Sequence, residues 1–242
     1  MRGVACVRVV LVAAAMAVCG ANNASAQFGQ GSVEAEQFLL FAGVDLWRNG
    51  GFAHGGFLWS PGGLDKEGFT AKLMAGAGTY RYRIGTTTIE GDATIVDILP
   101  GWRFKPGNAE ITIFAGLDFQ HHRLSPDDPT NPARGSHLGL RVGADFWWEP
   151  TAGTMTNAGA NFATIGSGYW ARAAFGWRAF DSFFIGPEAL ALGDDSYRQW
   201  RIGAHLTALK TGPFEWSLGA GYVSDSDHHS GVYGRIGVLT RR

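Results

Sequence analysis

Thiols are almost missing from this chain of 242 residues. It has 2 cysteines, Cys6 and Cys19, and both lie close to the amino terminus. The apolar run that follows Arg8, together with the small-x-small triplet at 24–26, is typical of a secretory signal peptide. The sequence therefore predicts a signal over 1–26 that is removed on export, and a mature chain without a disulfide or a cysteine-based metal site.

Long apolar runs and an excess of either charge are also missing. Beyond the signal, no apolar run is long enough for a membrane-spanning helix, and the mean hydropathy is −0.03. The formal net charge is −1, and removal of Arg2 and Arg8 with the signal would lower it by two. This balance disfavours nucleic acid as a partner.

What the chain does have is a regular alternation of apolar and polar residues. In the segment 138–148 one face is wholly apolar and the other carries charge; the apolar face is Leu138, Leu140, Val142, Ala144, Phe146 and Trp148. Successive residues of a strand point to opposite faces, so the pattern predicts a strand with one apolar face. The pattern recurs almost to the end of the chain, and no helix is available to cover it. We therefore expect an all-β fold, an antiparallel up-and-down transmembrane β-barrel with a polar lumen.

The alternation predicts about twelve strands, an even number as single-chain bacterial barrels have. A flexible lead-in occupies 27–36 and the barrel 37–242. The expected strands are 37–47, 52–60, 68–82, 89–104, 109–123, 136–149, 154–165, 168–180, 182–193, 196–209, 213–224 and 230–240. Short turns alternate with loops, and the longest loop, 124–134, is outward if the chain starts in the periplasm. Asp92 and Asp97 have opposite parity, which predicts a bulge or a wrong boundary in 89–104.

The polar faces of these strands define a lumen with both signs of charge. We expect its lining to include Asp45, Trp47, Lys72, Asp118, Arg141, Asp145, Trp147, Arg172, Arg178, Glu188, Arg201, His205, Glu215 and Arg235. The near balance of charge favours ion pairs that stiffen the wall. A polar channel in which aromatic rings stack on sugars is the other interpretation, and the sequence leaves both open.

Histidines and acidic residues gather where the outer rim is expected. His121, His122, His137, His228 and His229 could lie near the acidic stretches 193–196 and 224–227, whose oxygens would suit a divalent cation. Neither stretch has the spacing of a helix–loop–helix calcium site, and solvated loops explain both. We expect no bound metal and no cofactor.

An enzyme is the less favoured interpretation. His205 points inward with Ser217 on a nearby strand, and no Gly-x-Ser-x-Gly motif is present. An outer-membrane lipid or glycan hydrolase is therefore kept only as an alternative. The chain closes on Thr240-Arg241-Arg242 and not on the aromatic residue that barrel insertion machinery reads, so a soluble periplasmic β-barrel binding protein is a further alternative.

Four stretches together resemble a known family. They are 41–50, 64–69, 174–178 and 192–205, of which Gly193-Asp194-Asp195-Ser196-Tyr197-Arg198 is the most specific. They resemble the cellulose biosynthesis protein BcsS family of alphaproteobacteria. The resemblance implies an outer-membrane accessory protein of cellulose (exopolysaccharide) biosynthesis and secretion, a non-enzymatic pore or scaffold. Its implied partners are outer-membrane lipid, β-glucan and components of the cellulose synthase and export apparatus. The family pattern supplies no catalytic or ligand residue.

Overall fold

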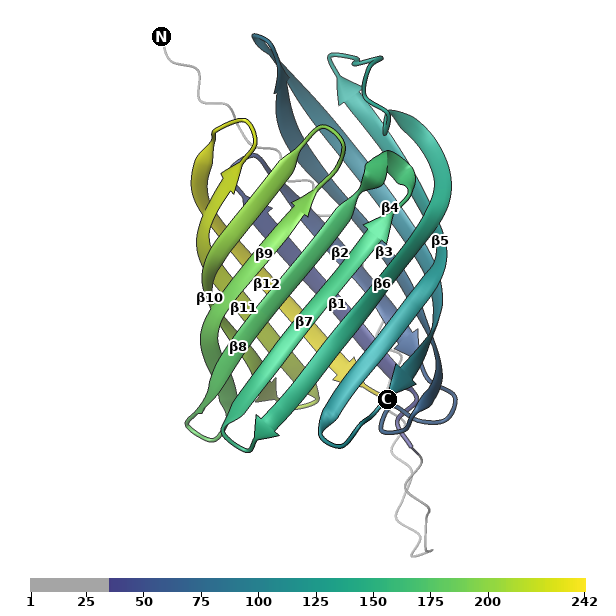
Figure 1. The fold of residues 1–242 in the computed structure, drawn as a ribbon, viewed down its shortest axis with the longest axis vertical. Helices are drawn as coiled ribbons and strands as arrows, with labels where there is room; N and C mark the ends of the chain where they lie inside the picture. Colours follow the sequence, from purple (N-terminus) through teal and green to yellow (C-terminus); the bar gives the residue numbers. More distant parts are fainter. Residues whose placement is uncertain (1–34) are drawn as a thin grey trace, which may run out of the picture. The chain divides into compact units, whose positions relative to one another are not determined.

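A computed structural model describes residues 35–242, which form a closed barrel of twelve antiparallel strands (Figure 1). Each strand pairs with its neighbours along the chain, and the first strand closes the barrel on the last. The strands are β1 Phe38–Trp47, β2 Gly50–Trp59, β3 Gly68–Ile84, β4 Thr87–Phe104, β5 Ala109–Ser125, β6 Gly135–Thr151, β7 Thr154–Ala163, β8 Tyr169–Ala179, β9 Phe183–Gly193, β10 Arg198–Thr211, β11 Phe214–Asp225 and β12 Ser230–Arg241.

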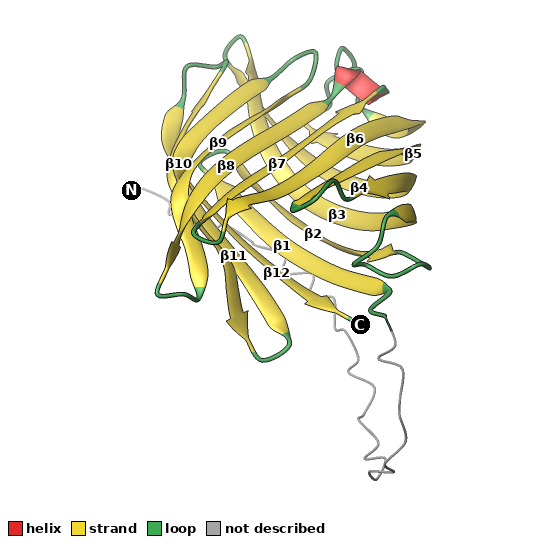
Figure 2. Ribbon diagram, turned by 60° about the horizontal axis from the view of Figure 1, so that its bottom comes forward, coloured by secondary structure: helices red, strands yellow, loops and turns green. Residues whose placement is uncertain are grey.

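The predicted antiparallel barrel is confirmed, including its strand number. Figure 2 shows that strands make up nearly all of it, with the short 3-10 helix η1 Ile165–Ser167 at one rim. No helix within residues 35–242 is long and apolar enough to cross a bilayer. The expected signal, 1–26, and most of the expected lead-in fall outside the described residues.

β4 carries its two aspartates on opposite faces without any bulge. Its pairing with β3 and with β5 keeps one register from end to end. Asp97 faces the lumen and is fully buried, whereas Asp92 faces outward opposite Arg123 of β5. The ion pair between Arg81 and Glu90 also lies on this outer face. The expected bulge is therefore wrong. β4 instead extends beyond the apolar part of the barrel wall, to a polar part of the outer surface that we call the polar collar and that includes Arg81, Glu90, Asp92 and Arg123.

Below that collar the outside of the barrel is apolar. Ile98, Leu117 and Leu140 are cross-strand neighbours on β4, β5 and β6, and each is about half exposed. Trp102 and Trp177 are exposed near the ends of their strands on the side of the short turns. An apolar surface bordered by indoles fits a bilayer, because an indole has an apolar body and a polar N–H.

The outer connections are bonded to one another. The Asp195 amide donates to the Gly166 carbonyl in the β7–β8 connection, and the Ser226 amide of the β11–β12 connection donates to the Arg198 carbonyl at the start of β10. The Arg83 amide, at the tip of β3, donates to Asp227. These contacts join connections that are remote in sequence, so we call them together the outer hoop.

The longest outer loop, 126–134, is bound to Tyr82 of β3 through two side chains, Asp128 and Asn131. Asp128 accepts the hydroxyl of Tyr82 at 2.6 Å, and its other oxygen accepts the amide and hydroxyl of Thr130 at 3.0 and 2.7 Å. These donors stabilise the ionised carboxylate and hold the pKa of Asp128 below its usual value. The loop is thereby tethered to the inner face of β3.

Candidate functional site: the lumen

A belt of charged side chains crosses the middle of the lumen. We call it the charged belt, and its members are Asp45, Asp97, Asp118, Arg141, Arg172, Glu188, Arg201 and Arg235. Several of its ion pairs join strands that are not neighbours in the sheet. Contacts of that kind can form only through the interior of a closed barrel.

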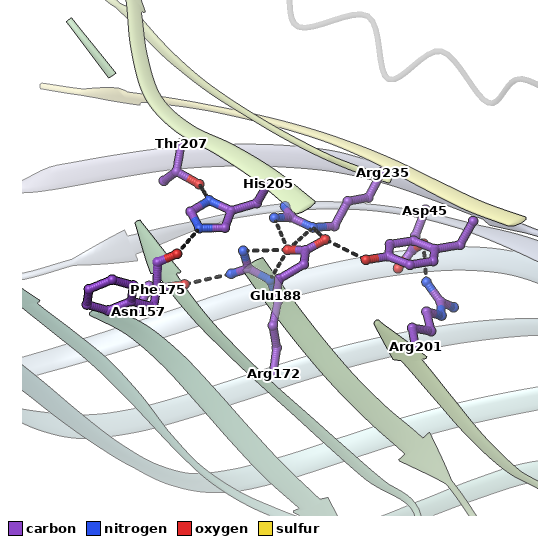
Figure 3. Close-up of polar contacts among 10 residues, drawn as sticks. Asp45, Asn157, Arg172, Phe175, Glu188, Arg201, His205, Thr207 and Arg235 are labelled. Atoms are coloured by element: carbon purple, nitrogen blue, oxygen red, sulfur yellow. Dashed lines mark hydrogen bonds and ion pairs between the residues drawn. The ribbon is translucent and has the colours of Figure 1, made fainter. Parts of the chain in front are cut away.

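Glu188 on β9 binds two arginines at once (Figure 3). Its Oε2 lies 2.9 Å from Arg172 Nε on β8 and 2.6 Å from Arg235 Nη2 on β12. Its Oε1 accepts the hydroxyl of Tyr233 at 2.9 Å. Arg172 also donates to Asn157 Oδ1 at 2.6 Å. Bonds this short to a buried carboxylate are charge-assisted, so this cluster fixes four strands relative to one another.

Arg201 on β10 is completely enclosed. Its Nη1 lies 2.5 Å from Asp45 Oδ1 on β1, and its Nε donates to Gln199 Oε1 at 2.7 Å. The guanidinium lies 4.9 Å from the ring centre of Trp47 and 5.2 Å from that of Tyr233. Aromatic faces stabilise a cation that has lost its water, which allows this arginine to be buried.

On the β4–β6 side of the lumen, the charged belt has more carboxyl groups than arginines. Arg141 on β6 lies 3.0 Å from Asp97 on β4 and 3.0 Å from Asp118 on β5, and it donates to Asn161 on β7 at 2.8 Å. Here two carboxyl groups share one arginine. On the side of Glu188 and Asp45, these two carboxylates face three arginines, Arg172, Arg201 and Arg235. The belt therefore has an excess of carboxyl groups on one side of the lumen and an excess of arginines on the other.

Below the belt, toward the short turns, apolar side chains fill the lumen. We call this set the apolar floor, and its members are Leu39, Leu58, Leu64, Leu99, Phe114, Met155 and Phe184. Leu64 comes from the β2–β3 connection, where Arg103 donates to its carbonyl at 2.6 Å. Phe184 packs edge-on against Trp147, with Arg178 over its ring at 4.3 Å. The floor was not predicted from the sequence, although apolar residues at inward parity were its signal.

The remaining expected lumen residues also have partners, most of them ionic. Lys72 lies 2.5 Å from Asp145 and over the Phe114 ring, and Trp147 donates to Glu149 at 3.0 Å. Two further ion pairs are Arg178 with Glu149, at 3.2 Å, and Glu215 with Arg241, at 3.1 Å.

His205 is occupied by partners other than the expected serine. Its Nε2 lies 3.1 Å from the Phe175 carbonyl, which can only accept, so this nitrogen carries the proton. Its Nδ1 then accepts the Thr207 hydroxyl at 2.9 Å (Figure 3). Both nitrogens are engaged, so the expected geometry with Ser217 is not formed.

The expected rim histidines and carboxylates come together at one place only among the described residues, where His229 Nδ1 lies 3.7 Å from Asp225 Oδ1. His121 bonds Ser136, and His137 donates to the Arg134 carbonyl. Asp194 accepts the amides of Ser196 and Tyr197, while burial raises its pKa. Among residues 35–242, no group of three His, Asp or Glu side chains could hold a metal ion.

With this geometry in place, the chain can be compared with known proteins. It matches the family described as cellulose biosynthesis protein BcsS over residues 39–242. The chain belongs to this family. The resemblance of 192–205 and the other three stretches to BcsS is thus confirmed, and it places the protein in cellulose biosynthesis.

Solved structures with a similar fold are outer-membrane barrels. The translocator domain of the autotransporter NalP from Neisseria meningitidis has 12% identity and a TM-score of 0.51, with 87% of this chain and 90% of that chain covered. The KdgM porin has 10% identity and a TM-score of 0.49, with 84% and 98% covered. At 12% identity, the likeness to the NalP translocator domain shows the fold alone, an outer-membrane-type β-barrel. No curated protein matches the chain.

Proposed function

We propose that this BcsS family protein resides in the outer membrane as a non-enzymatic scaffold of the cellulose machinery, with a filled lumen and no wide glucan channel. Membership of a cellulose biosynthesis family supports the pathway. The apolar outside, with Leu140 and Ile202 more than half exposed, supports the membrane location. The engagement of both His205 nitrogens supports a role without catalysis.

The burial of the inward side chains carries the proposal. Arg201, Phe114 and Phe184 are between 1% and 2% exposed as whole residues, although all three point into the barrel. Side chains that line a wide aqueous pore are reached by solvent, whereas these are packed as in a protein core. The charged belt and the apolar floor thus occupy successive levels of the lumen.

A conductance measurement tests the filled lumen. Purified protein in planar bilayers is expected to conduct far less than an open twelve-stranded porin. Phe184→Ala removes a large floor side chain and is expected to raise conductance. Ile185→Ala is the matched control, because the next residue faces outward and is about half exposed, and it should leave conductance unchanged.

A cellular measurement tests the scaffold. In a strain that lacks this protein, surface glucan should be restored by the wild type and equally by Phe184→Ala, since a scaffold does not depend on how the floor is filled. Wild-type conductance at the level of an open porin, blocked by cello-oligosaccharide, would show that the protein is a glucan pore and overturn the proposal.

A further inference from the structure

The acid pair of the charged belt has more negative charge than its surroundings neutralise. Asp97 and Asp118 are direct cross-strand partners on β4 and β5, and their side chains are 1% and 0% exposed. Arg141 is the one cation that contacts them among the described residues. Two ionised carboxylates beside one guanidinium would leave a buried negative charge uncompensated, and such a charge is costly.

Two oxygens of the pair have no hydrogen-bond partner within residues 35–242. They are Asp97 Oδ2 and Asp118 Oδ1, both shielded from solvent. The two residues stand directly opposite each other in the register of β4 and β5, and both carboxyl groups contact the same Arg141 guanidinium at 3.0 Å. A proton on one of them would donate to the other, which would remove the excess charge and satisfy both carboxyl groups. Carboxyl groups that share a site hold a proton in this way.

The histidine nearest to the pair does not supply the missing positive charge. Gln120 Nε2 donates to Asp118 Oδ2 at 2.8 Å, so its Oε1 is left to accept from His122 Nε2 at 3.0 Å. His122 Nδ1 lies 2.9 Å from the Tyr80 hydroxyl. Both ring nitrogens are thus engaged by Gln120 and Tyr80, and neither of them bonds to a carboxyl group of the pair.

Other charged groups on the flanking strands are engaged elsewhere. Lys72 on β3 is bound by Asp145 on β6 at 2.5 Å. His137 on β6 lies 2.8 Å from the carbonyl of Arg134, to which it donates. Asn161 on β7 is uncharged and accepts from Arg141. The strands packed against the pair therefore offer no second cation to it.

We propose that Asp97 and Asp118 bind one proton between them, so that the lumen contains a proton-binding site in addition to the scaffold role. The hydrogen-bonded series Tyr80, His122 and Gln120 ends on Asp118 and orients that carboxyl group. Loss of the proton in alkaline medium places like charges directly opposite each other on β4 and β5, which destabilises their pairing.

Infrared spectroscopy of the full barrel in lipid vesicles tests the site. In mildly acidic medium, where an ordinary aspartate is ionised, the wild type should show the C=O stretch of a protonated carboxyl group, shifted in D2O. Asp97→Asn and Asp118→Asn should each lose this band, and either variant suffices if the other does not fold. Asp145→Asn, which alters a half-exposed lumen carboxylate, is the matched control and should retain it.

Thermal unfolding against pH gives a second readout. Wild-type stability should fall as the medium becomes alkaline, and Asp97→Asn should abolish that fall because an amide does not ionise. The absence of the carboxyl band, or its survival in both variants, would overturn the proposal. So would stabilisation of the wild type, but not of Asp97→Asn, by Na⁺ or K⁺ relative to choline, since the ligand would then be a metal cation. Conductance plays no part in this test, so it fails or succeeds independently of the filled lumen.

Discussion

At the residue scale, burial separates the ion pairs that matter from those that do not. Glu188 and its two arginines are almost fully enclosed, and each bond runs between different strands. The pair between Arg178 and Glu149 is about one third exposed on both sides. Solvent screens exposed pairs, whereas a buried charge depends on its partner.

Glu188→Gln should therefore be strongly destabilising. It leaves Arg172 and Arg235 without their common carboxylate, and removal of one partner from a buried pair costs about 3–5 kcal/mol. Urea unfolding in vesicles measures the change. Glu149→Gln is the matched control, for which we expect about 0–1 kcal/mol. Equal effects of the two substitutions would contradict this ranking.

The sequence predicts whether a side chain faces the lumen or the outside, but it does not predict which side chain it contacts. Period-two alternation places Asp118 and Arg141 inside, because parity along one strand is a local property. Whether Asp97 meets Asp118 depends on the register between β4 and β5, which parity within a strand does not determine. The floor was missed for a related reason: Leu58 and Phe114 are apolar wherever they point, so composition does not distinguish a filled lumen from a lipid-facing wall.

At the scale of elements, the loop 126–134 is tethered to β3 by the carboxylate of Asp128 and by Asn131, whose Nδ2 donates to the Tyr82 hydroxyl at 2.9 Å. Asp128→Ala removes the acceptor of Tyr82 and Thr130, so the loop amides should exchange with solvent faster. Asp127→Ala is the control, because Asp127 makes only an exposed pair with Arg134. Hydrogen exchange measured by mass spectrometry reports both. Unchanged exchange in Asp128→Ala would show that the tether is not what orders the loop.

The same tether should depend on pH in a defined direction. The folded-state pKa of Asp128 is lowered, so its stabilising contribution is fully present above the ordinary value of about 3.9. It is lost as the pH falls through the lower folded value. Exchange of the loop should therefore stay constant from neutral pH down to about pH 4 and rise only in more acidic medium, after correction for intrinsic exchange rates. A rise already near pH 6 would contradict this.

At the scale of the whole molecule, closure of the barrel depends on backbone contacts at its seam. The Arg242 carbonyl accepts the amides of Gln37 and Phe38 at 2.7 and 2.8 Å, and β12 pairs with β1 up to Arg241. Truncation after Val238 should expose an unpaired strand edge and abolish the heat-modifiable folded band in electrophoresis. The double substitution Arg241→Ala and Arg242→Ala keeps the backbone and should retain that band. A truncated chain that still folds would show that the seam is dispensable.

The outer hoop has a mechanical consequence. Because the connections around Gly166, Arg198 and Asp227 are bonded to one another, a load applied to one of them is shared around the rim and is not taken up by a single hairpin. Separation of one connection from its neighbours therefore requires the breaking of hydrogen bonds to other connections as well as those within its own hairpin.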